Sequence, residues 1–384
     1  MWYYINIERG ESVIKSFKIK IHPNEQQKEL MFKSFGTSRF AYNWALETQI
    51  KNKENGGKFI SDGDLRKRFT QFKKLEGNEW IKEVNNNVTK QAIKDCCKAY
   101  KNFFKGQTKF PKFKSKRKSK LSFYVDTHKI YFNESQVKME TIGVVNLAEK
   151  DRIPIGCKYY NPRVSFDGIS FWLSIGCEVE EDISCKKKTE PIGIDLGIKT
   201  LMVCSNGVGV KQIRIKREEK KLKRLQKRAS KHYEQMKHDK TKVKSRNLIK
   251  LETQIKKLHI RISNLRTNHI HQATTKLIKL NPSHIVIEDL NVSGMMKNKH
   301  LSKVVAHSSF YEIRRQLEYK CLNNGIELVI ADRWYPSSKM CSCCGNVKEK
   351  LSLSERTYKC ESCGIELDRD YNASLNLRNL AISL

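Results

Sequence analysis

The stretch that decides the fold is "PIGIDLGIKT", residues 191–200, a short apolar strand between two glycines that carries Asp195 in its middle. A carboxylate buried in a sheet costs several kcal/mol unless it is paired, neutralised or bound to a cation. Something at Asp195 must therefore offset this cost: a paired group, neutralisation of the carboxylate or a bound cation.

Two further acidic residues stand at the ends of predicted elements. Glu288 closes the apolar strand "SHIVIEDL" (283–290), and Asp370 stands at the start of the predicted last helix (367–380). If the fold brings both to Asp195, the three carboxylates could hold two divalent ions, as in RNase H-like nucleases that hydrolyse phosphodiesters. Mg²⁺ or Mn²⁺ suits such oxygen ligands. From spacing alone, helix caps or ion pairs remain the simpler alternative.

Five of the twelve cysteines crowd between residues 341 and 363. Cys341 with Cys344, and Cys360 with Cys363, form two C-x2-C pairs separated by 15 residues, which is the spacing of a four-thiolate zinc ribbon. Cys343 is a spare thiol. The scattered cysteines are predicted to be small buried apolar residues: Cys96, Cys97, Cys157, Cys177, Cys185, Cys204 and Cys321.

The charge of the chain favours a polyanionic partner. The 384 residues contain 75 Lys and Arg against 41 Asp and Glu, a formal charge of +34. The amino terminus does not have the pattern of a signal peptide, and no apolar run approaches the ~18 residues of a spanning helix. We therefore expect a soluble intracellular protein of two or three domains that binds nucleic acid rather than membrane.

A first basic patch is predicted at residues 106–124, where seven Lys and Arg residues occur without an acidic one. Phe110, Phe113, Phe123 and Tyr124 interleave with these cations, a mixture that suits single-stranded or distorted nucleic acid. A solvated basic loop is the alternative. The candidate contacts are Lys109, Lys112, Lys114, Lys116, Arg117 and Lys118.

A second basic patch is predicted at residues 211–266, which hold 21 Lys and Arg against 5 Asp and Glu. Leucines and isoleucines from Leu248 to Leu265 follow alternating spacings of three and four, which predicts an antiparallel helical hairpin with a narrow apolar seam. A solvated coiled coil would explain the leucines but not the excess of positive charge. Lys223 and Arg224 are candidate nucleic-acid contacts.

The remaining pattern predicts an α+β chain. A strand at 12–24 precedes helical segments at 24–50 and 87–105, and alternation returns over 125–180, which indicates a β-rich module with inserted helices. After Asp195, two strands around Asn206-Gly207, a helix near 305–323 and the strand "IELVIA" complete the pattern.

With these residues in view, the sequence resembles the TnpB family of transposon-encoded proteins, relatives of the type V CRISPR effector nucleases. The matching stretches are "GIDLGIKT", "IVIEDL", "DRWYPSSKMCSCCG", "YKCESCG" and "DRDYNASLNL", with weaker matches in "FGTSRFAYNWAL", "KFPKFKSK" and "LHIRISNLRTNHIHQ". Asp370 matches the D-x-N-A pattern of the family, whereas Asp368 is expected to face solvent or pair with a basic neighbour. Family members often have aspartate where this chain has Asn268.

The resemblance implies a RuvC-type, RNase H-like nuclease domain at 189–338 and 367–384, with the basic hairpin at 211–266 inserted in it and a zinc ribbon at 339–366. It implies an amino-terminal β-barrel at 1–188 with a helical insertion near 24–120. Asp195, Glu288 and Asp370 would be the magnesium ligands. A guide RNA would pair with double-stranded DNA next to a short flanking motif and displace one strand.

Three functions are compatible with these features. An RNA-guided DNA endonuclease, acting in the prokaryotic cytoplasm at the nucleoid, accounts for the charge, the acidic residues and the ribbon together. A transposase that acts directly on the ends of its element would carry similar carboxylates. A guided DNA-binding repressor would be expected to have lost a carboxylate, and all three are present here.

Overall fold

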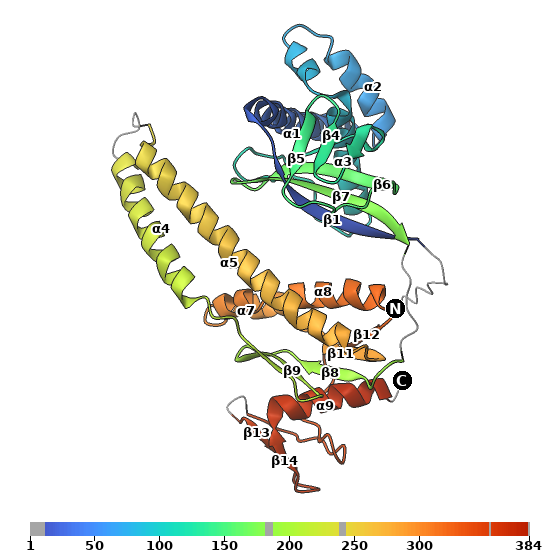
Figure 1. The fold of residues 1–384 in the computed structure, drawn as a ribbon, viewed down its shortest axis with the longest axis vertical. Coiled ribbons are helices and arrows are strands. Elements are labelled where there is room, and N and C mark those ends of the chain that lie inside the picture. The colour runs from blue at the N-terminus through green and yellow to red at the C-terminus, as the bar shows by residue number, and fades with distance from the viewer. Residues whose placement is uncertain (1–11, 181–186, 238–242, 353–354, 383–384) are drawn as a thin grey trace. The chain divides into compact units, whose positions relative to one another are not determined.

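The computed structural model describes residues 12–180, 187–237, 243–352 and 355–382. The chain divides into two compact units, residues 1–181 and 182–384 (Figure 1). Cys185, predicted to be buried, lies outside the described residues. None of the described helices is long and apolar enough to cross a membrane.

The first unit is built on a seven-stranded antiparallel sheet in the order β2-β6-β7-β1-β5-β4-β3. Its strands are β1 (Ser12–His22), β2 (Leu121–Tyr124), β3 (Ile130–Phe132), β4 (Gln136–Met139), β5 (Gly143–Leu147), β6 (Tyr159–Phe166) and β7 (Phe171–Glu180). Strand β1 lies between β7 and β5, so the first of the described strands is central in the sheet.

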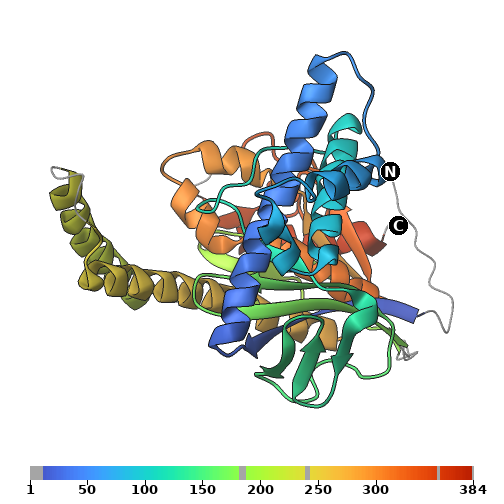
Figure 2. The same cartoon turned by 90° about the horizontal axis from the view of Figure 1, so that it is seen from above.

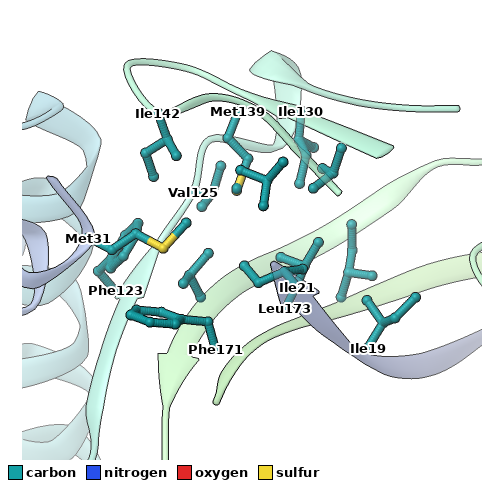
Figure 3. Close-up of a cluster of buried hydrophobic side chains, with 14 of the residues drawn as sticks. Ile19, Ile21, Met31, Phe123, Val125, Ile130, Met139, Ile142, Phe171 and Leu173 are labelled. Atoms are coloured by element: carbon teal, nitrogen blue, oxygen red, sulfur yellow. The ribbon is translucent and has the colours of Figure 1, made fainter. Parts of the chain in front are cut away.

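Alternation along β1 explains how this sheet makes its core. Ile19 and Ile21 are fully buried, while Lys18 and Lys20, at the alternate positions, lie on the other face of the strand. Phe123 of β2 and Ile130 of β3, at opposite ends of the strand order, enter the same core, so the sheet curves around it (Figure 3). The described pairings do not join β2 to β3, and the closed barrel therefore stays a prediction.

Three α-helices follow β1 before the sheet resumes. They are α1 (Glu25–Glu54), α2 (Asp62–Phe72) and α3 (Asn86–Phe104). A capping box between Asn24 and Gln27 begins α1. The sequence pattern did not reveal α2, which buries only Leu65 and Phe69 and depends on its cap at Ser61.

The second unit contains a mixed five-stranded sheet in the order β10-β9-β8-β11-β12. The strands are β8 (Ile192–Asp195), β9 (Thr200–Cys204), β10 (Gly209–Lys211), β11 (His284–Glu288) and β12 (Glu327–Ala331). Strands β8, β11 and β12 are parallel. Helices α5 (Arg246–Lys279) and α8 (Phe310–Asn323) cover one face and α9 (Arg369–Ile382) the other (Figure 1). The chain is thus a mixed α and β protein of more than one unit.

The predicted hairpin is formed by α4 (Lys216–Lys237) and α5, which project together from the sheet of their own unit (Figure 2). The predicted leucine seam is buried between them. The helix α5 does not end at residue 266 as predicted but continues to Lys279. It continues because Ile270, Ala273 and Leu277 extend the apolar stripe onto the sheet.

The single helix predicted near 305–323 is two helices, α7 (Ser302–Ser308) and α8. Ser309 separates them with a φ of 52°, a left-handed backbone that neither helix can continue through. The remaining elements are a short helix α6 (Val292–Lys297) and the hairpin of β13 (Thr357–Lys359) and β14 (Glu366–Asp368) beside the cysteine cluster.

Candidate active site

Strand register brings Asp195 and Glu288 to one edge of the sheet. Ile194 of β8 pairs with Ile287 of β11, so the two acidic residues are the next positions on neighbouring parallel strands. Because side chains alternate, both carboxylates share the face of Gly193 and Val286. That face is covered by α9.

The close approach of α9 to β8 depends on Gly193. A Cβ atom at this position would lie 2.1 Å from the carbonyl oxygen of Ser374 and 2.4 Å from the amide nitrogen of Arg378. Only glycine lets a helix backbone pack this tightly on the strand. The first turn of α9, with Asp370, is thereby placed at the edge where Asp195 and Glu288 lie, and Asp195 interacts electrostatically with both carboxylates.

The electrostatics of Asp195 are those of a cation site. Its side chain is 8% exposed, and burial, then Glu288, then Asp370 raise its pKa well above the usual carboxyl range, with partial relief from Arg369. Among the described residues, Arg356 and Arg369 form ion pairs with Asp370, and no basic side chain forms an ion pair with Asp195. The carboxyl groups therefore suit a bound divalent cation, which would offset their repulsion.

Replacing Asp195 with asparagine should stabilise the metal-free protein. The pKa of Asp195 is raised in the folded state above its ordinary 3.8, so the protonated carboxyl group contributes stability at low pH. That contribution is lost as the pH rises through the folded-state pKa. We expect Asp195→Asn to raise the Tm at neutral pH in EDTA by about 2 °C or more, with the difference disappearing in acid. Calorimetry across pH measures this, and an Asn variant that is less stable at neutral pH would contradict it.

Glu288 is oriented by a residue that the sequence pattern did not single out. The buried hydroxyl of Ser337 donates a hydrogen bond to Glu288 Oε1. Burial raises the pKa of Glu288, the Ser337 bond opposes that rise, and Asp370 adds to it. The available signal was the position of Ser337 in "DRWYPSSKM", one of the stretches that resemble the TnpB family.

The two aspartates of "DRDYN" have different surroundings and different roles. Asp370 lies in the first turn of α9, where the helix dipole favours a negative charge, with Arg369 Nη2 at 3.1 Å. Asp368 is exposed, as expected, and its carboxylate also accepts hydrogen bonds from the backbone amides of Asp370 and Tyr371, each at 3.0 Å. Asp368 thus fixes the turn that presents Asp370.

The four predicted cysteines converge. The Sγ atoms of Cys341, Cys344, Cys360 and Cys363 all lie within 4.8 Å of one another, with Cys341 3.6 Å from Cys363 and Cys344 3.5 Å from Cys360. Tetrahedral zinc, with Zn–S bonds of about 2.3 Å, separates its sulfurs by about 3.8 Å. The group could therefore hold a zinc ion, and Cys343 is exposed and outside it.

Buried asparagines of α9 join this cysteine group to the carboxylates. Asn376 Nδ2 donates to the carbonyl oxygens of Ser337 at 2.7 Å and Met340 at 2.6 Å, and Asn372 Nδ2 donates to Met340 at 2.8 Å. Asn372 also accepts from the Ser342 amide at 3.0 Å. Because Ser337 bonds Glu288, the first cysteine knuckle, α9 and one carboxylate form a single hydrogen-bonded assembly.

Breaking the cysteine group should therefore disturb the carboxylates. We expect Cys363→Ser to lose the zinc that the group could hold. If the carboxylates form the nuclease site that the family resemblance implies, its DNA cleavage should fall on the order of 100-fold, the cost of a shift of about 1 Å at a catalytic centre. Cys343→Ser is the matched control and should keep both. Metal content by mass spectrometry and cleavage rate are the measurements; full activity of a zinc-free Cys363→Ser protein would refute the link.

The basic loop at 106–124 is only partly as predicted. Five of its candidate cations are exposed: Lys109, Lys112, Lys116, Arg117 and Lys118. Lys114 instead lies with Nζ 3.7 Å from the centre of the Tyr42 ring, and burial lowers its pKa. Phe123, proposed as a stacking ring, is wrong for that role because it belongs to β2 and is buried in the core, whereas Phe113 is 55% exposed.

The candidate contacts of the hairpin lie on the exposed surface of α4. Lys223 lines a groove of about 780 Å³ formed by α4, α5 and α7, and Arg224 is exposed on the same helix. Other cations of this groove are Lys216, Lys220, Arg266 and Lys303. Glu219 lies among them and pairs with His307 at 3.0 Å, so the groove is basic but not uniformly so.

Comparison with known proteins matches three parts of the chain to family models. A model described as "Probable transposase" matches residues 174–299, one described as "Cas12f1-like, TNB domain" matches 310–377, and one described as "Helix-turn-helix domain" matches 13–58. The last stretch contains β1 and the single long helix α1 in this structure.

Two relatives align over nearly the whole chain. A protein of Streptomyces pristinaespiralis named "Putative RNA-guided DNA endonuclease" is 31% identical over 371 residues, covering 96% of this chain and 89% of its own length. A protein of Escherichia coli K12 with the same description, InsQ, is 29% identical, covering 95% and 91%. Among solved structures, that of a Cas12f1–sgRNA–target DNA complex superimposes with a TM-score of 0.62 at 13% identity, covering 96% of this chain and 99% of that one.

The family models place this chain in the class of transposon-encoded, nuclease-like proteins. Its fold is that of a Cas12f effector. The chain belongs to the TnpB family.

Proposed function

We propose that this protein is an RNA-guided, metal-dependent DNA endonuclease that cuts DNA matched to a guide RNA beside a short flanking motif. The observation that supports it most is the burial of Asp195 at the edge of the sheet, where it interacts electrostatically with Glu288 and Asp370 and, among the described residues, forms no ion pair. The names of the similar proteins support the RNA-guided part.

The three carboxylates would hold Mg²⁺ or Mn²⁺, and such ions supply an activated water and stabilise the leaving oxygen of the phosphodiester. The chain's own residues prepare the site. Asp195 and Glu288 are held by paired strands, Ser337 fixes the rotamer of Glu288, and α9 places Asp370. The Cys341, Cys344, Cys360 and Cys363 group would bind zinc and hold the first knuckle against α9.

The domain roles are part of the same proposal. Residues 189–338 and 367–384 would form the RuvC-type nuclease, 339–366 the zinc ribbon, and 1–188 a barrel with inserted helices that recognises nucleic acid. Guide RNA, double-stranded target DNA and its displaced strand would be the partners, in the cytoplasm at the nucleoid. The charge of +34 supports polyanionic partners.

The protein should carry RNA when it is expressed with its native flanking sequence. Sequencing of the copurified RNA tests this directly, and we expect a uniform species derived from one flank. Purified protein with the absorbance ratio of bare polypeptide, or with RNA of random origin, would contradict the guided function.

The basic loop should contribute to RNA binding by its location and not only by its charge. Neutralising exposed Lys116, Arg117 and Lys118 to glutamine should weaken RNA binding and lower the salt slope by about 0.7 for each phosphate that the loop no longer neutralises. The control removes equal charge from the exposed residues Lys138, Lys150 and Arg152. Filter binding from 50 to 300 mM salt, roughly the range where counterion release is measurable, separates the two; equal reductions in affinity would refute the assignment of the loop.

A further inference from the structure

A pocket beside the carboxylates has a lining that, apart from Glu288, the metal site does not use. It has a volume of about 390 Å³ and opens where β11 ends, on the side of α8. Its floor is apolar, with Leu196, Ile287 and Phe310. Its polar lining residues are Glu288, Asn291, Ser293, Tyr311, Arg314 and Arg333. A flat apolar ligand with polar edges therefore suits the pocket better than a bare ion.

Two arginines on this lining are held in place by the same carboxylate. Arg314 Nη1 is 3.1 Å from Asp289 Oδ1, and Arg333 Nη2 is 2.5 Å from Asp289 Oδ2. Arg314 Nε donates a hydrogen bond to Glu318, and Arg333 Nε donates one to the carbonyl oxygen of Asp289. A guanidinium has five donors, and in the described part of the chain Nη2 of Arg314 and Nη1 of Arg333 have no partner. These donors are pre-positioned for an anionic oxygen.

Exposed aromatic rings accompany the arginines. Tyr311 is 72% exposed although its neighbour Phe310 is buried, and Trp334, next to Arg333 in the chain, is 85% exposed. Of the two, Tyr311 lines the pocket, so the face of its ring is available there to a flat ligand. Aromatic rings beside cations are the combination with which proteins bind single-stranded nucleic acid, by stacking bases and contacting phosphates.

We propose that this pocket holds an unpaired base of the DNA strand that is being cut, immediately beside the scissile phosphate. Tyr311 would stack on the base, and Arg314 and Arg333 would contact the adjoining phosphates. The inference rests on the proposed function and specifies its substrate. A base that enters such a pocket must be unpaired and unstacked from its neighbours.

Single-turnover DNA cleavage tests the pocket. The full chain with its guide RNA is mixed in excess, but below its saturating concentration, with target-strand DNA that is unpaired at the cut. Tyr311→Ser should lower kcat/KM on the order of 10-fold, and Tyr311→Phe, which keeps the ring, should retain most of the rate. Arg314→Gln should also lower it, whereas Arg315→Gln is the control because Arg315 pairs with Glu312 and does not line the pocket. A normal rate for Tyr311→Ser overturns the proposal.

The substrate provides a matching test. An abasic nucleotide beside the cut should cost the wild-type protein the same factor as Tyr311→Ser, and the two changes together should cost no more than either alone. Effects that multiply would mean that the ring and the base act independently, which overturns the proposal.

A binding measurement separates this inference from the proposed function. An iodouracil placed beside the cut in the DNA strand should photo-cross-link to Tyr311 in the Asp370→Ala complex, which needs no cleavage. If the wild-type protein cuts DNA but no such cross-link forms, or if only an iodouracil in the guide RNA cross-links there, the pocket assignment fails and the nuclease stands. A cross-link to DNA in a protein that never cuts would support the pocket while the nuclease fails.

Discussion

We expect Asp370→Ala to abolish DNA cleavage, lowering the rate ~1,000-fold or more, and to leave the binding of guide RNA and target DNA unchanged within about twofold. The effect is large because the carboxyl group is one of three that would hold the metal ions, and no neighbouring residue can replace it from the first turn of α9. Binding persists because the basic surfaces that would contact the phosphates lie elsewhere. Cleavage of labelled DNA and filter binding measure the two quantities.

Asp368 gives the matched comparison. Asp368→Asn keeps an oxygen that can cap the amides of Asp370 and Tyr371, and it should leave the cleavage rate within a few-fold of wild type. If Asp368→Asn were inactive and Asp370→Ala active, the assignment of the ligand within "DRDYN" would be reversed.

Gly193→Ala should strongly destabilise the second unit. The new Cβ would meet the backbone of α9 at 2.1 and 2.4 Å, so the helix must move rather than a side chain. Overpacking of this kind costs about 3 kcal/mol or more, which corresponds to a fall in Tm of about 6 to 12 °C. The same displacement carries Asp370 away from Asp195, and cleavage should fall on the order of 100-fold even below the Tm.

Gly209→Ala is the control for this effect. Gly209 lies in β10 of the same sheet, and a Cβ there would have no heavy atom within 4 Å. Its Tm should change by about 1 °C or less. Calorimetry of the two variants decides the matter, and equal stability of Gly193→Ala and Gly209→Ala would show that α9 does not depend on this contact.

Residue type and spacing were sufficient to predict the candidate ligands. Asp195 is conspicuous because it interrupts an apolar strand, and two C-x2-C pairs at this spacing are typical of a zinc site. The contacts of Ser337 with Glu288 and of Asn376 with Met340 could not be predicted, because they join segments that are adjacent only after α9 packs on the sheet. No local pattern encodes that packing.

Two local errors have physical causes. The sequence pattern places Phe123 in a basic aromatic loop, but a strand begins at Leu121 and its alternation carries the ring inward. The break between α7 and α8 depends on a left-handed serine, Ser309, for which the sequence offers no glycine or asparagine as a signal.

The measurement that tests the central claim most directly is cleavage of a plasmid library by the purified protein with its own copurified RNA. The plasmids carry a target that matches the guide next to randomised flanking bases. We predict cutting at the matched target beside one flanking motif, in Mg²⁺ or Mn²⁺ and not in EDTA, and none by Asp195→Ala. Cutting that continues with Asp195→Ala, that ignores the guide, or that is absent from the wild-type protein with its RNA bound would contradict the account.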